Sequence, residues 1–120
     1  MTLEQKLRAL ADQYKRDPNL STAARTRACA EVRRTHPWIC TVCHLPIPRD
    51  VDHQTSRLAH TVDEIIPRSL GGSATDPANL GPAHRMCNSM RSNGPITEDL
   101  TTRCRTAILA LTTQRTSRRW

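Results

Sequence analysis

Apolar side chains near the start of the chain recur every three or four residues, which is the spacing of one face of an α-helix. This pattern predicts a helix over residues 2–16, with Thr2 as its N-cap. A second helix is expected over residues 21–35, capped by Ser21 or Thr22. The chain therefore begins with two helices.

The middle of the chain has shorter apolar segments separated by prolines and glycines. Residues 37–60 are predicted to be irregular because three prolines interrupt them. Residues 60–66 are predicted to form a strand that ends before Pro67. A turn over residues 76–80 leads to a second short strand, and residues 84–91 are expected to form a short helix.

A longer helix is predicted over residues 97–115, with Thr97 as a cap and two acidic residues at its positive end. The sequence thus predicts an α+β protein with three segments. These are an N-terminal helical extension over residues 1–36, a core over residues 37–95, and a basic C-terminal helix over residues 96–120 that packs on the core.

The interior of this chain has few large side chains to fill it. Among 120 residues there is no phenylalanine, and aromatic residues make up 2%. A small domain with so little aromatic volume is typically held together by a disulfide or a metal ion.

Two pairs of metal-ligating residues lie far apart in the sequence, and each has a two-residue gap. The first pair is Cys40 and Cys43, and the second is His84 and Cys87. Three thiolates and one imidazole suit tetrahedral Zn²⁺, and a shell of four protein ligands is structural rather than catalytic. We therefore expect a zinc ion to join the two ends of a folded segment.

Positive charge is concentrated at the two ends of the chain. The formal charge is +7, with +4 in residues 1–39, zero in residues 40–95 and +3 in residues 96–120. Clustered basic charge is the electrostatic footprint of nucleic-acid binding, so we expect the ends to contact phosphates and the neutral centre to carry the chemistry.

The five cysteines are an odd number, which argues against a framework made only of disulfides. No segment is predicted to be a signal peptide or to span a membrane, since the longest apolar run is residues 107–111. We therefore expect no membrane partner and a reducing, cytoplasmic location, where paired cysteines bind metal more often than each other.

The residues between the two metal-ligating pairs carry a recognisable motif. It consists of Val62-Asp63-Glu64-Ile65-Ile66-Pro67, then Gly71-Gly72, then Asp76-Pro77-Ala78-Asn79-Leu80, then His84-Arg85-Met86-Cys87-Asn88. The segment from Cys40 to Arg91 resembles the HNH endonuclease family, which implies a small ββα-metal core built around one divalent ion. Because phage and prophage members often carry flanking zinc pairs, the resemblance also suggests a phage setting and the host cytoplasm.

The resemblance implies a role for several residues of this motif. Asp63 is expected to ligate the catalytic ion, and Asn79 to hold the loop that positions the base. Asn88 stands where the last histidine of the family motif is usual, so Asp63 and Asn88 together would offer oxygen ligands. Oxygen ligands favour Mg²⁺ or Mn²⁺ as the catalytic ion.

The general base is open between two residues. Glu64 stands at the position of the family's usual histidine, whereas His60 shares a strand face with Glu64 and could reach the same site. The alternation of a strand also means that Asp63 and Glu64 enter one site only if the strand ends or bulges there. A further reading makes Glu64 a second metal ligand or a lost catalytic group.

Three arginines flank the acidic centre and are expected to contact DNA phosphates: Arg68, Arg85 and Arg91. The function predicted from all these features is a metal-dependent DNA endonuclease that hydrolyses phosphodiester bonds. The alternative is a non-catalytic zinc module that binds nucleic acid or a phage packaging protein such as a terminase, because two histidines of the family motif are missing.

Overall fold

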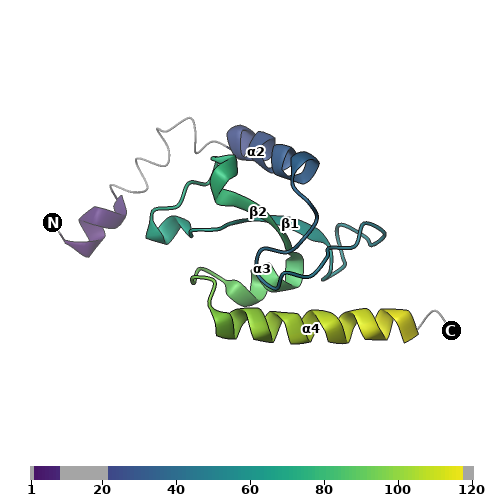
Figure 1. Cartoon of the computed structure of the whole chain (residues 1–120). Helices are drawn as coiled ribbons and strands as arrows, with labels where there is room; N and C mark the ends of the chain where they lie inside the picture. Colours follow the sequence, from purple (N-terminus) through teal and green to yellow (C-terminus); the bar gives the residue numbers. More distant parts are fainter. Residues whose placement is uncertain (1, 9–21, 118–120) are drawn as a thin grey trace.

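The computed structural model describes residues 2–8 and 22–117, and its elements alternate between helices and two short strands (Figure 1). Residues 3–8 are helical. The labelled elements that follow are α2 (Thr22–Thr35), β1 (His60–Glu64), η2 (Arg68–Leu70), η3 (Pro77–Asn79), β2 (Leu80–His84), α3 (Arg85–Arg91) and α4 (Glu98–Ser117). The expected α+β class is confirmed.

Strands β1 and β2 pair in antiparallel fashion, with His60 opposite His84 and Glu64 opposite Leu80. Helix α2 lies on one side of this ribbon, and α3 and α4 lie on the other (Figure 1). Two strands alone are marginal in water, so packing from both sides is what stabilises them.

The α2 side of the ribbon has a small apolar core. Ala28 and Val32 of α2 pack against Val62 of β1 and Leu80 of β2, and all four are buried. Because strand side chains alternate, His60 and Glu64 also face α2, while Asp63 faces α3. The expected helix over residues 21–35 is confirmed as α2; its predicted cap Ser21 and the cap side chain of Thr22 lie outside the description.

The first predicted helix is partly described. The Thr2 hydroxyl accepts a hydrogen bond from the Gln5 amide at 3.2 Å, and the Gln5 side chain accepts one from the Thr2 amide at 2.9 Å. This reciprocal pair is a capping box, which confirms Thr2 as the N-cap. The helix is described over residues 3–8, and residues 9–16 of the prediction lie outside the described residues.

A second, larger core lies on the other side of the ribbon. Helix α4 contributes Leu100, Cys104 and Ile108, which are buried against α3 and the loop that holds Cys40 and Cys43. The Thr97 hydroxyl accepts a hydrogen bond from the Leu100 amide at 3.1 Å, so the predicted cap of the last helix is confirmed. This helix ends at Ser117, two residues beyond the predicted end.

The loop between the strands is held by Asn79. Its Oδ1 accepts a hydrogen bond from the Ile66 amide at 2.9 Å, and its Nδ2 donates to the carbonyls of Ile66 at 3.0 Å and Ser73 at 2.8 Å. These bonds turn the chain away from the ribbon after Glu64. The first strand therefore ends at Glu64 rather than at residue 66 as expected.

None of the helices within residues 2–8 and 22–117 combines the length and the apolar character that a bilayer crossing requires.

Gly72 has no room for a side chain. A Cβ at this position would lie 1.7 Å from the Ile66 carbonyl oxygen and 2.8 Å from Asn79 Nδ2. We expect Gly72→Ala to lower the free energy of unfolding by about 1–3 kcal/mol, because the loop backbone must shift. Gly94→Ala is the matched control, since its Cβ would meet Arg91 O at an ordinary 3.7 Å. Urea denaturation of both variants measures the difference, and equal stability would contradict this account of the loop.

Candidate metal centre and catalytic pocket

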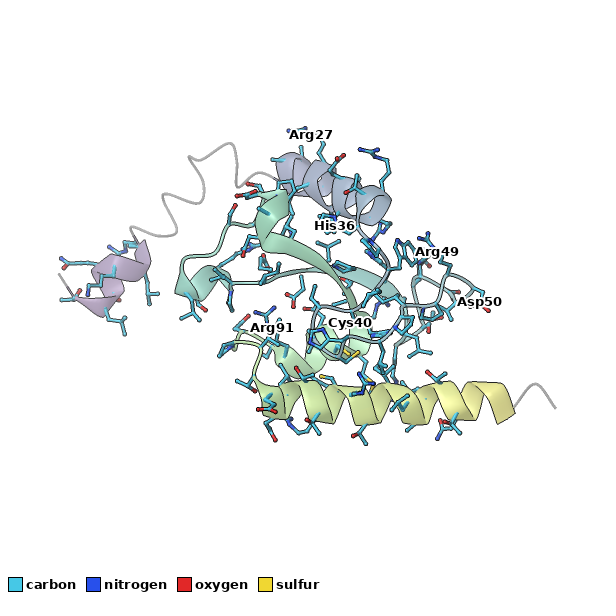
Figure 2. The ribbon with its side chains drawn as sticks, viewed as in Figure 1. Arg27, His36, Cys40, Arg49, Asp50 and Arg91 are labelled. Carbon is cyan, nitrogen blue, oxygen red and sulfur yellow. The ribbon has the colours of Figure 1, made fainter. Side chains whose placement is uncertain are left out.

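Four potential metal ligands converge between the sheet and α4. The ligand atoms of Cys40, Cys43, His84 and Cys87 all lie within 4.8 Å of one another, and all four residues are buried. Figure 2 shows the sulfur atoms near Cys40 gathered between the ribbon and α4. Within the described residues this is the one group of three or more histidine, cysteine and acidic residues placed to hold an ion.

Local backbone geometry aims the first pair of thiols inward. Residues 39–46 form a tight loop closed by a bridge between Ile39 and Pro46. The Cys40 sulfur accepts hydrogen bonds from the amides of Val42 at 3.4 Å and Cys43 at 3.5 Å. Backbone donors of this kind stabilise a thiolate, which is the form that binds metal.

His84 is oriented by a hydrogen bond on the far side of its ring. Its Nε2 lies 3.0 Å from the carbonyl oxygen of Pro46, which can only accept, so Nε2 carries the proton and donates. The opposite nitrogen, Nδ1, faces the sulfur atoms of Cys43 at 3.4 Å and Cys87 at 3.7 Å. A histidine whose second nitrogen donates to a carbonyl is the usual arrangement at a zinc site.

The pKa values in this cluster are displaced in opposite directions because its members share protons. Hydrogen bonds from Cys43 and Cys87 lower the pKa of the Cys40 thiol, whereas hydrogen bonds to Cys40 and Cys43 raise that of Cys87. Burial lowers the pKa of His84, but its bonds to Cys40 and Cys43 outweigh burial and raise the pKa to about 9. Three thiols and an imidazole packed this closely fit the donor set of a tetrahedral zinc ion.

The remaining described cysteines lie outside this group. Cys104 is fully buried, and its sulfur contacts the sulfur of Met90 at 3.8 Å. Cys29 is half-buried beside the α2 core. Both fill apolar space, as a free cysteine usually does.

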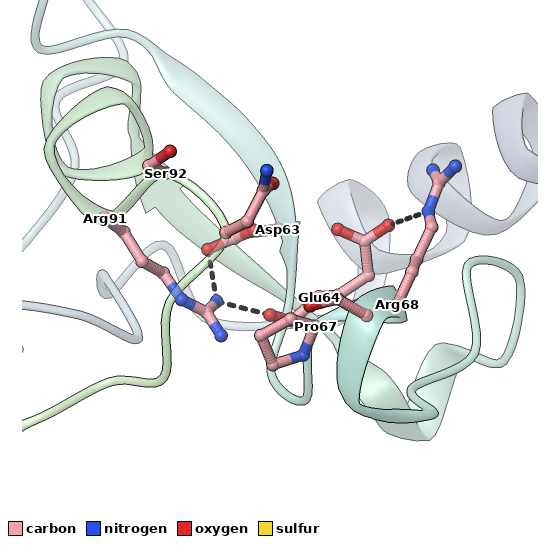
Figure 3. Close-up of a pocket in the computed structure, with 8 residues that line it drawn as sticks. Asp63, Glu64, Pro67, Arg68, Arg91 and Ser92 are labelled. Carbon is pink, nitrogen blue, oxygen red and sulfur yellow. Dashed lines mark hydrogen bonds and ion pairs between the residues drawn. The ribbon is translucent and has the colours of Figure 1, made fainter. Parts of the chain in front are cut away.

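A polar pocket of about 450 Å³ lies where β1 ends next to the end of α3. The residues that line it are Asp63, Glu64, Pro67, Arg68, Ser69, Arg91, Ser92 and Asn93. Figure 3 shows the Asp63 carboxylate directed toward Arg91 and the Glu64 carboxylate directed toward Arg68. Consecutive residues reach the same pocket from opposite faces because the strand ends at Glu64.

Asp63 forms a buried ion pair with Arg91. Arg91 Nη1 lies 2.5 Å from Asp63 Oδ2, and the two side chains are 1% and 9% exposed. The same guanidinium donates to the carbonyl oxygens of Glu64, Ile65 and Gly94. Arg91 was expected to contact DNA phosphates, but in the structure its N–H groups donate to acceptors of the protein. Arg91 therefore connects parts of the fold to one another.

Glu64 lies between two arginines from different elements. Its Oε1 is 2.6 Å from Arg68 Nε and 3.0 Å from Arg25 Nη1, and Arg25 also donates to the Ala74 carbonyl at 2.8 Å. The Glu64 side chain is 15% exposed. Arg25 belongs to α2 and was not predicted for the site, because a basic helix face carries no signal of a partner 39 residues away.

The other two predicted phosphate contacts differ in their surroundings. Arg68 is exposed at the mouth of the pocket and remains placed to meet a ligand. Arg85 instead donates from its two terminal nitrogens to the backbone carbonyls of His53 and Gln54. It therefore anchors the loop before β1 rather than facing the pocket.

His60 and Asn88 do not join the pocket. His60 lies four residues before Glu64 on β1, about 13 Å away along a strand, and packs against the ring of Trp38 with a centroid distance of 4.4 Å. The pKa of His60 is lowered to about 4, first by burial and then by the charge of Arg33. Asn88 is half-buried on α3 and is not among the residues that line the pocket.

Comparison with known proteins agrees with these observations. The family model described as HNH endonuclease matches residues 40–94, which contain β1, β2, α3 and the four clustered ligands. No curated protein and no solved structure gives a significant match to the chain. Residues 40–94 of this chain are therefore similar to the HNH endonuclease family.

Proposed function

We propose that this protein is a metal-dependent DNA endonuclease that hydrolyses phosphodiester bonds in the pocket at the end of β1. The observation that carries the proposal is the meeting of Asp63, Glu64 and Arg68 in one polar pocket, within the segment that matches the HNH family. Carboxylates beside an exposed arginine offer what phosphate hydrolysis requires: a proton acceptor, a cation ligand and a phosphate contact.

Asp63 would hold the catalytic Mg²⁺ or Mn²⁺. The residues present fit such an ion, because Mg²⁺ is usually bound by one or two carboxylates together with waters and substrate phosphates. An ion there would stabilise the charge that builds on the phosphate during hydrolysis. Arg91 fixes the direction of the Asp63 carboxylate through its Oδ2 bond. Asn88, the second expected ligand, does not line the pocket.

Glu64 is the proposed general base. It lines the pocket, whereas His60 lies at the other end of the strand. Its contacts with Arg25 and Arg68 hold the carboxylate in one position, which is how an enzyme keeps a base aligned with an attacking water. Asn79 would act indirectly by holding the loop that carries Pro67 and Arg68.

Zinc at Cys40, Cys43, His84 and Cys87 would have a structural role. It would join the loop before β1 to the start of α3, and so fix the strand end against the helix end. The division at residues 36 and 95, the cytoplasmic location and the phage packaging partners stay predictions.

Zinc dependence can be tested by metal content and stability together. We expect about one zinc per chain by elemental analysis, and chelation should unfold the protein because structural zinc contributes on the order of 10 kcal/mol to folding. Cys87→Ala should lose the metal, while Cys29→Ala should keep it, since Cys29 lies outside the cluster. A chain that stays folded without any transition metal would contradict the structural role.

Glu64→Gln tests the base with the least disturbance of the fold. Replacing Asp63 would leave the buried Arg91 charge unpaired, at a cost of about 3–5 kcal/mol, so loss of activity there would be ambiguous. We expect Glu64→Gln to lower the rate of supercoiled plasmid nicking by about 100-fold or more. Zinc content and melting temperature should be retained. The control is Asp99→Asn, which removes an exposed ion pair on α4. Nicking at the wild-type rate by Glu64→Gln would contradict the role of Glu64 as the base.

His60 makes a separate prediction about pH. Its pKa is about 4 in the folded chain and near 6.5 when unfolded, so the unfolded state binds the proton more tightly. Stability linked to His60 is complete above pH 6.5 and falls as pH drops toward 4, by about 3 kcal/mol in all.

In urea denaturation series between pH 7 and about 5, the His60→Gln variant should lose less stability than the wild type. Plasmid nicking at neutral pH should persist in this variant, because His60 is far from the pocket. Loss of nicking with unchanged DNA affinity in a folded His60→Gln chain would shift the base role to His60.

A further inference from the structure

A second cluster of functional side chains surrounds Trp38, at the end of β1 opposite the pocket. The guanidinium of Arg49 stacks over the Trp38 ring at 3.9 Å from its centroid. The rings of His60 and His53 lie 4.4 Å and 6.3 Å from it, and Arg33 reaches His60 from α2. We call these five residues the Trp38 patch.

Packing and a histidine hold the two arginines of this patch, and neither is in the ion pairs found among the described residues. Arg33 Nε donates to His60 Nδ1 at 3.5 Å, and Arg49 rests on the indole face by a cation–π contact. Among the described residues, the ion pairs involve other arginines, namely Arg25, Arg34, Arg68, Arg91 and Arg103. Arg33 and Arg49 are both exposed, so each presents an oriented charge to solvent.

His60 is buried among the positively charged groups of this patch. It is 4% exposed, and its Nε2 is buried without a hydrogen-bond partner among the described residues. After burial, the charges of Arg33, His53 and Arg49 are the causes that lower its pKa. The carboxylate of Asp52 accepts bonds from the amides of Gln54 and Thr55 within its own turn.

Helix α2 contacts both the pocket and the Trp38 patch, which lie at opposite ends of β1. Arg25 contacts Glu64 at one end of β1, and Arg33 contacts His60 at the other end, about 12 Å farther along the helix. In Figure 2, Arg49 lies to the right of the two strands, whereas Arg91 lies below and to the left of them. Since one DNA strand carries a phosphate every 3.4 Å of axial rise, the separation corresponds to roughly four nucleotides.

We propose that the Trp38 patch binds the sugar–phosphate backbone of duplex DNA through Arg33 and Arg49, a few nucleotides from the pocket. The guanidinium fork suits bidentate contact with phosphate oxygens, and both forks are already positioned by packing. The indole is covered by Arg49 and His60, so it supports Arg49 rather than stacking on a base. The contact is therefore independent of DNA sequence. It rests on the proposed function only in taking DNA as the partner.

The test measures binding separately from cleavage. Full-length zinc-bound protein is titrated into a short fluorescein-labelled duplex without added Mg²⁺ or Mn²⁺, and affinity is followed by anisotropy across a salt series. Arg33→Ala and Arg49→Ala should each weaken binding about tenfold, the value of one charged hydrogen-bond pair. Each should also reduce the slope of log affinity against log salt by about 0.9.

Arg34→Ala is the matched control, because Arg34 is the neighbouring residue on α2 and is paired with Glu31 at 2.6 Å. It should bind nearly as the wild type does. Arg33→Lys and Arg49→Lys keep the charge but lose the planar fork, so they should fall between the wild type and the alanine variants. Unchanged zinc content and melting temperature exclude misfolding as the cause of any loss.

A second readout follows Trp38 directly. In a Trp120→Phe background, Trp38 is the remaining tryptophan of the chain, so adding duplex should change its emission as Arg49 engages phosphate. Wild-type affinity in both alanine variants, or an equal loss in Arg34→Ala, overturns the proposal. If the protein binds DNA through Arg33 and Arg49 but does not nick it, the proposed patch stands and the proposed nuclease function fails. If the protein nicks DNA while both alanine variants bind normally, the nuclease function stands and the proposed patch fails.

Discussion

The buried ion pair between Asp63 and Arg91 joins the parts of this molecule that form the pocket. One guanidinium contacts the end of β1 through Asp63, Glu64 and Ile65, and the α3–α4 connection through Gly94. Such a pair is costly to bury and more costly to break, because either partner alone would be an uncompensated charge. The pair therefore fixes the carboxylate that the proposed catalytic ion needs, and any cation must bind Asp63 alongside Arg91.

The cysteine–histidine cluster explains how so small a chain holds the end of β1 and the α3–α4 connection in place. With no phenylalanine, the interior on the α4 side consists of thiols and medium-sized aliphatic side chains. An ion bound by four such ligands would supply cohesion that large apolar side chains supply elsewhere. Its ligands come from the loop before β1, the end of β2 and α3, and α3 also carries Arg91 of the pocket.

Local signals in the sequence predicted the elements and the metal ligands. The spacing of Cys40 and Cys43 and of His84 and Cys87 was informative because few residue types ligate zinc and a two-residue gap is geometrically favourable. The apolar periodicity predicted α2 and α4 to within two residues at each described end. These features depend on neighbours a few positions away, which a sequence displays directly.

Contacts across the fold could not be predicted in the same way. Arg91 was expected to contact DNA phosphates, and Arg25 was not expected in the site. The reason is that a basic residue on a helix shows nothing of the acceptors it will meet 28 or 39 residues away. His60 and Glu64 were correctly placed on one strand face, but the extended strand also separates them by about 13 Å, so one face holds two distinct environments.

The contact between Arg25 and Glu64 has a consequence for modularity. The segment that matches the family begins at residue 40, yet α2 lies before it and reaches into the pocket. A transplanted fragment limited to the matched residues would carry the motif and the metal ligands but would lack one of the two groups that restrain the acidic side chain. In this protein the boundary of the recognisable motif and the boundary of the working unit do not coincide.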